Sequence, residues 1–391
     1  MNMTCWDNLP QPFFILAPME AVTDVVFRHV VKQAGAPDVF FTEFANATGW
    51  VHAGDKAIAG RLIKTDDEHP LVAQIWGGEP GDMEQFAAHC AKIGFDGIDI
   101  NMGCPAKSAI KSGGAALIRR PDVAVAAIAA AKTARLPVSV KTRLGYTHVD
   151  EWREWLATIL RQDIVNLTIH LRTKKEMSKV PAHYELIDDI IKLRDEIAPQ
   201  TLLTINGDIR NRAQGKELAR QHPGVNGIMI GRGIFSDPFC FAHTDVSHIN
   251  SLQTTQKSGG DSSIEEAVTG VKPRQPNATG AQPRKEYSEM DESLTRTSSG
   301  IVPSDPHSIA DNDNGSDNTK SELIYLLHYH LDLFDHYQPT LGRPFETLKR
   351  FFKIYIRDFD GAKELREQLM HTTSTDEVRQ LITIEINKAP D

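Results

Sequence analysis

Apolar and polar positions follow a regular rhythm along the first 240 residues, in which short apolar runs alternate with stretches of helical spacing. The apolar runs predict strands at residues 13–19, 39–44, 71–76, 97–103, 138–144, 166–172, 202–208 and 227–233. Strands that alternate with helices are typical of parallel sheets. Eight units of nearly even spacing favour a closed (β/α)8 TIM barrel. A doubly wound open sheet is the structural alternative.

The composition changes abruptly after residue 245. Residues 246–320 are rich in Ser, Gly, Pro, Asn and charge, and they hold few large apolar side chains. Such a segment buries too little apolar surface to offset the entropy of ordering it, so we expect a disordered insert. Helical spacing then returns in "SELIYLLHYHLDLFDHY", "RPFETLKRFFKIYIRDF" and "DEVRQLITIEIN". The predicted parts are therefore a barrel domain at 1–245, the insert at 246–320 and a small all-helical C-terminal domain at 321–391.

Charge and cysteine content narrow the class of protein. The 391 residues contain no apolar run near the ~20 residues that span a bilayer, and the N-terminus lacks the pattern of a signal peptide. The four cysteines have neither metal-ligand spacing nor the density of a disulfide framework, which argues against a metal site and fits a reducing cytoplasm. The formal net charge of -9 ordinarily argues against a nucleic-acid partner, so such a partner would need a local basic region.

Polar residues stand at the C-terminal end of nearly every predicted strand. This is the end of the barrel where enzymes of this fold keep their active sites. A pocket over the barrel mouth requires such a set of side chains. In chain order the set contains Pro18, Met19, Glu20, Gln74, Asn101, Cys104, Lys141, Arg143, His170, Arg172, Asn206, Gly207, Asp208, Gly231, Arg232 and Gly233.

The last two strands point to a phosphorylated cofactor. "NGD" and "GRG" place backbone amides and the Arg232 guanidinium where barrels commonly bind phosphate. Lys141 lies in an otherwise apolar strand, where a charge is costly unless it is used. Lys141 could balance the negative charge of a reduced flavin ring, and Gln74 could hydrogen-bond the edge of that ring. The residues thus suit a flavin.

Several segments resemble the signature blocks of the tRNA-dihydrouridine synthases. They include "LAPMEAVTDVVFR", "AQIWG", "DINMGCPAKSAIKSGGAALIRRP", "VSVKTRLG", "IHLRTKKEMSKVPAHY", "INGDI" and "GIMIGRGIFSDPF", which run through residues 12–240. The Asn-x-Gly-Cys-Pro block, followed by Gly-Gly and Arg-Arg-Pro, is the most specific of them. The tail "RPFETLKRFFKIYI" is similar to the tRNA-binding domain of the family. The segment at 246–320 is not part of the usual family pattern.

The resemblance implies an FMN enzyme that reduces the C5=C6 bond of selected tRNA uridines and reloads its flavin from NADPH or NADH. It implies that hydride reaches C6, that Cys104 gives a proton to C5, and that Asn101 lies near the uracil. A thiol suits that role because it is mostly protonated at neutral pH, with an ordinary pKa of about 8.5. The implied flavin contacts are Pro18, Met19, Glu20, Gln74, Lys141, His170, Asn206, Gly207, Asp208, Gly231 and Arg232.

A basic region for a tRNA partner is found near the C-terminus. Between Arg343 and Arg357 there are five cations and one acid. Lys349, Arg350, Lys353 and Arg357 have offsets of three, four and seven residues, so they can share one helix face and contact phosphates. We count these four and Arg172 as substrate contacts, and we expect a cytoplasmic monomer without an obligate protein partner.

Two other functions compete with this interpretation. An FMN barrel that acts on a free small molecule, such as dihydroorotate or an enone, would explain the flavin site but not the basic tail. A tRNA-binding factor without catalysis would explain the tail, but it would not need Cys104, Lys141 and His170. Cys90, within the helical pattern "FAAHCAKIG", is expected only to pack in a helix.

Overall fold

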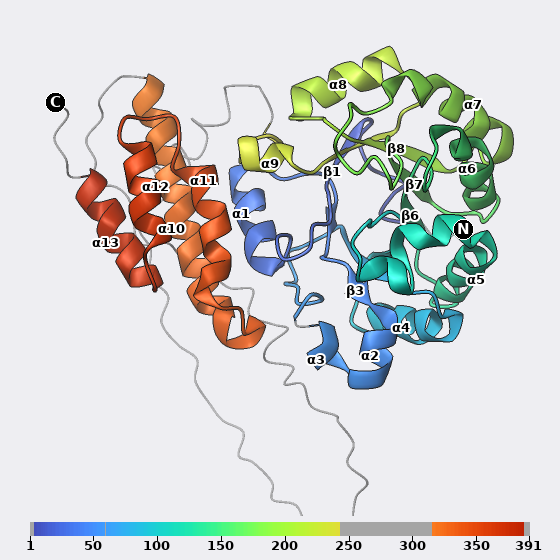
Figure 1. The fold of residues 1–391 in the computed structure, drawn as a ribbon, viewed down its shortest axis with the longest axis horizontal. Helices are drawn as coiled ribbons and strands as arrows, with labels where there is room; N and C mark the ends of the chain where they lie inside the picture. The colour runs from blue at the N-terminus through green and yellow to red at the C-terminus, as the bar shows by residue number, and fades with distance from the viewer. Residues whose placement is uncertain (1–3, 59, 243–314, 387–391) are drawn as a thin grey trace, which may run out of the picture. The chain divides into compact units, whose positions relative to one another are not determined.

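A parallel barrel forms the first part of the computed structural model, which describes residues 4–58, 60–242 and 315–386 (Figure 1). Its order is β1-β9-β8-β7-β6-β5-β4-β2, with β3 beside β4, and every pairing is parallel. The strands are β1 (Phe13–Leu16), β2 (Phe40–Phe41), β3 (Ala45–Asn46), β4 (Leu71–Trp76), β5 (Gly97–Asn101), β6 (Val138–Arg143), β7 (Asn166–His170), β8 (Leu202–Asn206) and β9 (Gly227–Ile230).

The sheet closes on itself. Strand β1 pairs with β9 along its whole length, and a bridge between Ile15 and Val39 joins the other edge of β1 to the residue before β2. The closed barrel predicted from the sequence is therefore confirmed, and the open sheet is excluded. The short strand β3 was not predicted. It follows β2 closely and continues the pairing along β4, from Ala45 opposite Ile75.

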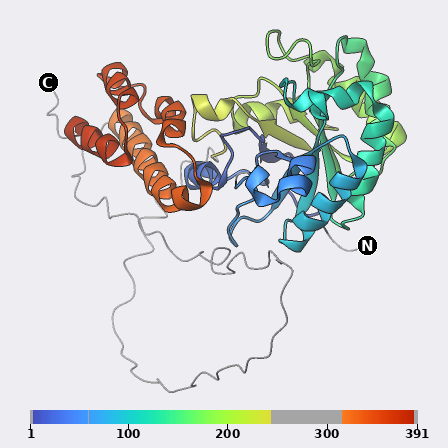
Figure 2. The same ribbon diagram turned by 60° about the horizontal axis from the view of Figure 1, so that its bottom comes forward.

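Helices surround the strands, as the two views show for α4 to α8 (Figures 1 and 2). Local sequence explains where several begin: Asp24 accepts a hydrogen bond from Phe27 N at the start of the first helix, and Pro121 opens another. The helices are α1 (Val25–Gly35), α2 (Ala47–Ala53), α3 (Asp55–Ile58), α4 (Pro80–Lys92), α5 (Pro121–Lys132), α6 (Trp152–Leu160), α7 (Ile187–Ile197), α8 (Arg212–Gln221) and α9 (Gly233–Ser236).

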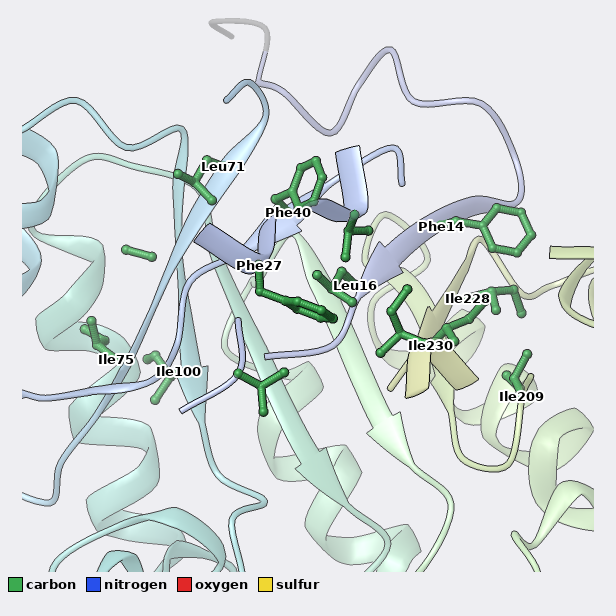
Figure 3. Packing of buried hydrophobic residues seen from close by; sticks show 14 of the residues in the cluster. Phe14, Leu16, Phe27, Phe40, Leu71, Ile75, Ile100, Ile209, Ile228 and Ile230 are labelled. Carbon is green, nitrogen blue, oxygen red and sulfur yellow. The ribbon is translucent and has the colours of Figure 1, made fainter. Parts of the chain in front are cut away.

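Alternate side chains of the strands enter two different apolar clusters. Phe14 belongs to the larger cluster, which fills the space between strands and helices; Figure 3 shows it near Ile228 of the paired strand. Phe13 and Ile15 belong to a smaller cluster on the inner side of the strands. The period of two that predicted the strands thus separates an outer core from an inner one.

The C-terminal residues form helices, as predicted. These are α10 (Gly315–Leu341), a 3-10 segment (Phe345–Phe351), α11 (Phe352–Tyr355), α12 (Ala362–Met370) and α13 (Thr375–Ile386). Helix α10 packs on α1, and the rings of Phe27 and Phe351 lie 4.8 Å apart between centroids. Helix α10 begins before the predicted boundary at 321, while residues 246–314 of the predicted insert lie outside the described residues. No helix in the described ranges has the length and apolar character needed to cross a membrane.

Candidate active site

A cavity of about 520 Å³ opens at the C-terminal ends of β1 and β6 to β9. Its lining includes Pro18, Met19, Lys141, His170, Asn206, Gly207, Asp208, Gly231 and Arg232 from the predicted cofactor contacts. Glu20 and Gln74, which were predicted with them, do not line it. Ser178, Arg210 and Ser236 also line the cavity and were not among the predicted site residues. Ser178 comes from a loop whose path is set by tertiary contacts, so no local pattern marks it.

The Asp208 carboxylate binds two arginine side chains at the cavity. Arg232 Nη2 donates to Asp208 Oδ1 at 3.0 Å, and Arg172 donates to the other carboxylate oxygen. Gly207 and Asp208 both have positive φ, at 128° and 53°, which lets the chain turn sharply after β8. The shared carboxylate therefore holds two guanidinium groups close together at the mouth.

Arg172 was predicted to contact substrate, and the structure corrects this assignment. Its side chain is 2% exposed, because it is enclosed by the loop that follows β7. The guanidinium donates to the Val180 carbonyl at 2.6 Å, to His170 Nε2 at 3.0 Å and to Asp208. Arg172 therefore supports two residues of the cavity wall and is not available to an incoming macromolecule.

Lys141 and His170 lie on the neighbouring strands β6 and β7, both line the cavity, and they differ in charge. Lys141 Nζ donates to Asn206 Oδ1 at 3.3 Å, and burial, with the nearby charge of Arg143, lowers the pKa of Lys141 to about 8. Burial and the surrounding cations hold the pKa of His170 far below its ordinary value, so its ring is neutral. Because arginine can only donate, His170 Nε2 accepts from Arg172 and the proton lies on Nδ1.

Cys104 lies in the loop after β5, as predicted, and its side chain is half-buried. Its backbone N–H donates to Asn101 Oδ1 at 2.9 Å, and its carbonyl accepts from Ala115 N at 3.0 Å. Gly114 allows this close return, because it has a φ of 56° and an added Cβ would lie 2.9 Å from Cys104 O. Cys90, by contrast, is fully buried in α4, which confirms its predicted packing role.

The surroundings of Cys104 keep its thiol protonated. Burial raises the pKa of the thiol above its ordinary value, and the Ala106 N–H, Arg143 and Lys141 offset part of that rise. Cys104 does not itself line the cavity. It follows Asn101, however, which is paired in register with the cavity residue Lys141. The charge of Lys141 also acts on the thiol, so the thiol lies near the cavity without lining it.

A buried polar layer lies beneath the Cys104 loop. Gln74 has no exposed surface; its amide donates to Asp99 Oδ2 at 2.7 Å and accepts from Asn101 Nδ2 at 2.9 Å. Ser139 donates to the other oxygen of Asp99 at 2.7 Å. Asp99 was not among the predicted site residues. A carboxylate inside the apolar strand "GIDIN" was a usable signal, of the same kind that drew attention to Lys141.

The basic residues of the tail, predicted to share a helix face, lie on two successive helical segments and the residues after them. Lys349 and Arg350 lie in the 3-10 segment, Lys353 lies in the short helix α11, and Arg357 follows that helix. Arg350 donates to Ala21 O at 3.0 Å, Lys353 lies over the Phe235 ring, and Arg357 donates to Ser236 O, whereas Lys349 pairs with Glu346.

Together these features define the class of protein: a TIM barrel with a cavity, lined in part by cationic side chains, at the C-terminal ends of its strands. The family model described as "Dihydrouridine synthase (Dus)" matches residues 15–265. The chain is 49% identical over 384 residues to "Probable tRNA-dihydrouridine synthase 2" of Bacillus subtilis (strain 168), covering 98% of this chain and 96% of that relative. The chain therefore belongs to the dihydrouridine synthase family, as its motifs predicted.

Two staphylococcal relatives extend this comparison. "Probable tRNA-dihydrouridine synthase" of Staphylococcus aureus (strain Mu50 / ATCC 700699) is 46% identical over 384 residues, covering 98% of this chain and 95% of the relative. The protein of the same name from Staphylococcus epidermidis (strain ATCC 12228 / FDA PCI 1200) is 46% identical over 98% of this chain and 96% of its own. These alignments span nearly the whole chain, so they run across residues 246–320, the segment that we took to be unusual in the family.

Proposed function

We propose that this protein reduces the C5=C6 bond of uridines in tRNA to 5,6-dihydrouridine, with FMN as cofactor and NADPH or NADH as the source of electrons. The observation that carries the proposal is a protonated, half-buried thiol at Cys104 beside a cationic cavity at the barrel mouth. Full-length relatives named tRNA-dihydrouridine synthases support the substrate.

The cavity suits a flavin nucleotide in size and charge. Its volume of about 520 Å³ falls within the roughly 300–1,000 Å³ of ordinary ligand sites. Arg232 and the glycine-rich ends of β8 and β9 would hold the phosphate, and Lys141 would face the ring. When bound, FMN would supply the hydride that adds to C6.

Cys104 would complete the addition across the double bond. A hydride at C6 leaves an electron pair shared between C5 and O4 of the uracil, and the thiol proton forms the new C5–H bond. The thiolate that remains lies near the cations Arg143 and Lys141, which stabilise it. Because Cys104 is half-buried rather than enclosed, solvent can return a proton to the sulfur between turnovers.

The tail contributes cations to the rim of the mouth. Arg350 and Lys353 are exposed; Arg350 contacts Ala21 in the loop after β1, and Lys353 contacts Phe235 in helix α9, which follows β9. Arg357 bonds the carbonyl of Ser236, a residue that lines the cavity. A uridine inside folded tRNA must be extruded to reach the cavity, and phosphates on either side of it would then pass these cations.

Anaerobic stopped-flow spectroscopy tests the proposal. The purified protein should hold FMN, NADPH or NADH should bleach its absorbance, and unmodified tRNA should restore it while dihydrouridine appears in the RNA. Restoration by dihydroorotate-type pyrimidines or enones but not by tRNA would favour a small-molecule oxidoreductase. Binding of tRNA without any reoxidation would favour a non-catalytic factor. A colourless protein that does not take up added FMN would overturn the assignment.

A further inference from the structure

We propose that Asp99 is a positioning residue, which sets the polarity of a buried hydrogen-bond chain that ends at the backbone of Cys104. The inference deepens the proposed function and rests on it, since it concerns the group that would deliver the proton. Asp99 lies in the middle of β5, two residues before Asn101, and its side chain has no exposed surface.

Consecutive hydrogen bonds connect four residues: Asp99, Gln74, Asn101 and Cys104. Gln74 Nε2 donates to Asp99 Oδ2 at 2.7 Å, and Asn101 Nδ2 donates to Gln74 Oε1 at 2.9 Å. Asn101 Oδ1 then accepts from Gly103 N at 3.1 Å and from Cys104 N at 2.9 Å. The strand register makes this path short, because Gln74 is opposite Asp99 on neighbouring strands.

The two ends of the chain have fixed polarity, and the two amides between them do not. An ionised carboxylate can only accept a hydrogen bond, and a backbone N–H can only donate one. A carboxamide can turn over and exchange its donor and acceptor. With Asp99 accepting, Gln74 must present its oxygen to Asn101, and Asn101 must then present its own oxygen to the Cys104 loop. Asp99 therefore determines which atom faces the loop from two side chains away.

Without an acceptor at position 99, nothing would fix the orientation of the Gln74 and Asn101 amides. Gln74 would keep an unpartnered buried N–H, or it would turn over and oppose the Asn101 amino group. Asn101 could then offer a donor to the N–H groups of Gly103 and Cys104, which repels them. The loop that carries the thiol would lose its acceptor. Ser139 is outside this path, because it bonds the other oxygen of Asp99.

Two substitutions separate polarity from packing. Asp99→Leu is similar in size but offers no acceptor, so the rate of tRNA-dependent reoxidation per bound flavin should fall about 10- to 100-fold, as small misplacements of reacting groups do. Asp99→Asn should stay within about threefold of wild type, because its carbonyl can accept from Gln74 while its amino group donates to Ser139. Rescue by Asn, and not by a group of similar volume, distinguishes positioning from filling space.

A second measurement does not depend on catalysis. The rate at which iodoacetamide labels Cys104, followed by peptide mass spectrometry against pH, should change in Asp99→Leu and match wild type in Asp99→Asn. Equal reoxidation rates and equal labelling profiles in all three proteins would overturn the inference.

If Asp99→Leu does not fold, a double-mutant cycle of Asp99→Asn and Ser139→Ala tests the inference instead. Ser139→Ala leaves the carboxylate in place and should retain the wild-type rate, as should Asp99→Asn. In the double variant, the amide introduced at position 99 has no Ser139 oxygen to accept its N–H. Nothing then fixes which of its two polar atoms faces Gln74. The rate of tRNA-dependent reoxidation should therefore fall by more than the product of the two single effects. Purely multiplicative effects would contradict the chain. Absence of tRNA reduction in the wild type would instead contradict the proposed function.

Discussion

At the scale of single residues, the proposed chemistry depends on the thiol of Cys104, whose burial favours its protonated form. Removal of that thiol should separate chemistry from binding. In Cys104→Ala, we expect FMN content and tRNA affinity to stay near wild type while single-turnover reoxidation by unmodified tRNA slows about 10²- to 10⁴-fold, the usual worth of a proton donor. Cys90→Ala, in the packed interior of α4, is the matched control and should change stability but not this rate. An undiminished rate in Cys104→Ala would remove the thiol from the mechanism.

Lys141 should confer a pH dependence on flavin affinity. Burial lowers its pKa to about 8, so the positive charge is present below that pH and is lost as the pH rises through it. The dissociation constant of FMN, measured by fluorescence, should therefore increase about 10- to 100-fold between neutral and alkaline pH, as expected when a charge-assisted contact is lost.

Lys141→Met provides the control for this pH dependence. The variant should bind FMN weakly and with no change over the same pH interval, because it has no charge to lose. A wild-type profile that is flat through pH 8 would show that the Lys141 charge does not contact the cofactor.

Arg232 should anchor the phosphate. Its guanidinium is largely exposed and is directed by Asp208, at 3.0 Å. Arg232→Ala should weaken FMN binding by about 10- to 100-fold, since hydrogen bonds to charged groups contribute about 1.5–3 kcal/mol. The matched control is Arg220→Ala on α8, which removes an exposed arginine that pairs with Glu217 of its own helix. Equal flavin content in the two purified variants would contradict the phosphate assignment.

At the scale of elements, the loop after β5 carries Cys104 and returns against it. The sequence "NMGCP" predicted that the cysteine leaves the core, and the Gly-Gly pair that follows is explained by the return of the chain against Cys104. Gly114→Ala should destabilise the protein by about 1–3 kcal/mol, because its φ of 56° and the nearby Cys104 carbonyl both disfavour a side chain. Urea unfolding would measure the change.

Gly81→Ala serves as the comparison for that substitution. Gly81 lies in the first turn of α4, and an added Cβ there would meet nothing within 4 Å. We expect this variant to be as stable as wild type or slightly more stable, as alanine favours helix. Similar losses in the two variants would show that Gly114 is not needed for the geometry of the loop.

At the scale of the whole molecule, a buried ion pair joins the tail to the barrel. Arg343 donates to Glu43, which has no exposed surface, and also lies 3.3 Å from Asp24. Burial raises the pKa of Glu43, and the Arg343 charge opposes that rise. Arg343→Ala should therefore cost about 3–5 kcal/mol of unfolding free energy, because it leaves a buried carboxylate without its partner.

The double variant with Glu43→Gln tests the cause of that loss. Replacement of the carboxylate removes the unpaired charge, so Arg343→Ala with Glu43→Gln should be more stable than Arg343→Ala alone in chemical denaturation. If the two substitutions simply add, then the pair does not stabilise the contact between tail and barrel.

Most of the fold could be predicted from the spacing of apolar residues in the sequence. Each of the eight predicted strands overlaps an observed one, because alternation between two buried faces leaves a clear trace in the chain. The strand ends were also predicted, and with them most of the cavity lining. The direction of individual side chains was not: Gln74 lies in the layer beneath the mouth, and Arg172 is enclosed by its own loop.

The sequence by itself determined a closed parallel barrel, a helical tail and a cysteine outside the core, since each depends on local spacing and on residue type. Only the tertiary structure decided which polar groups meet. The chain from Asp99 through Gln74 to Asn101 crosses from one strand to another, and the contacts of Arg343 and Arg357 join segments more than 100 residues apart. Such contacts arise from strand register and packing between distant segments, which no local pattern records.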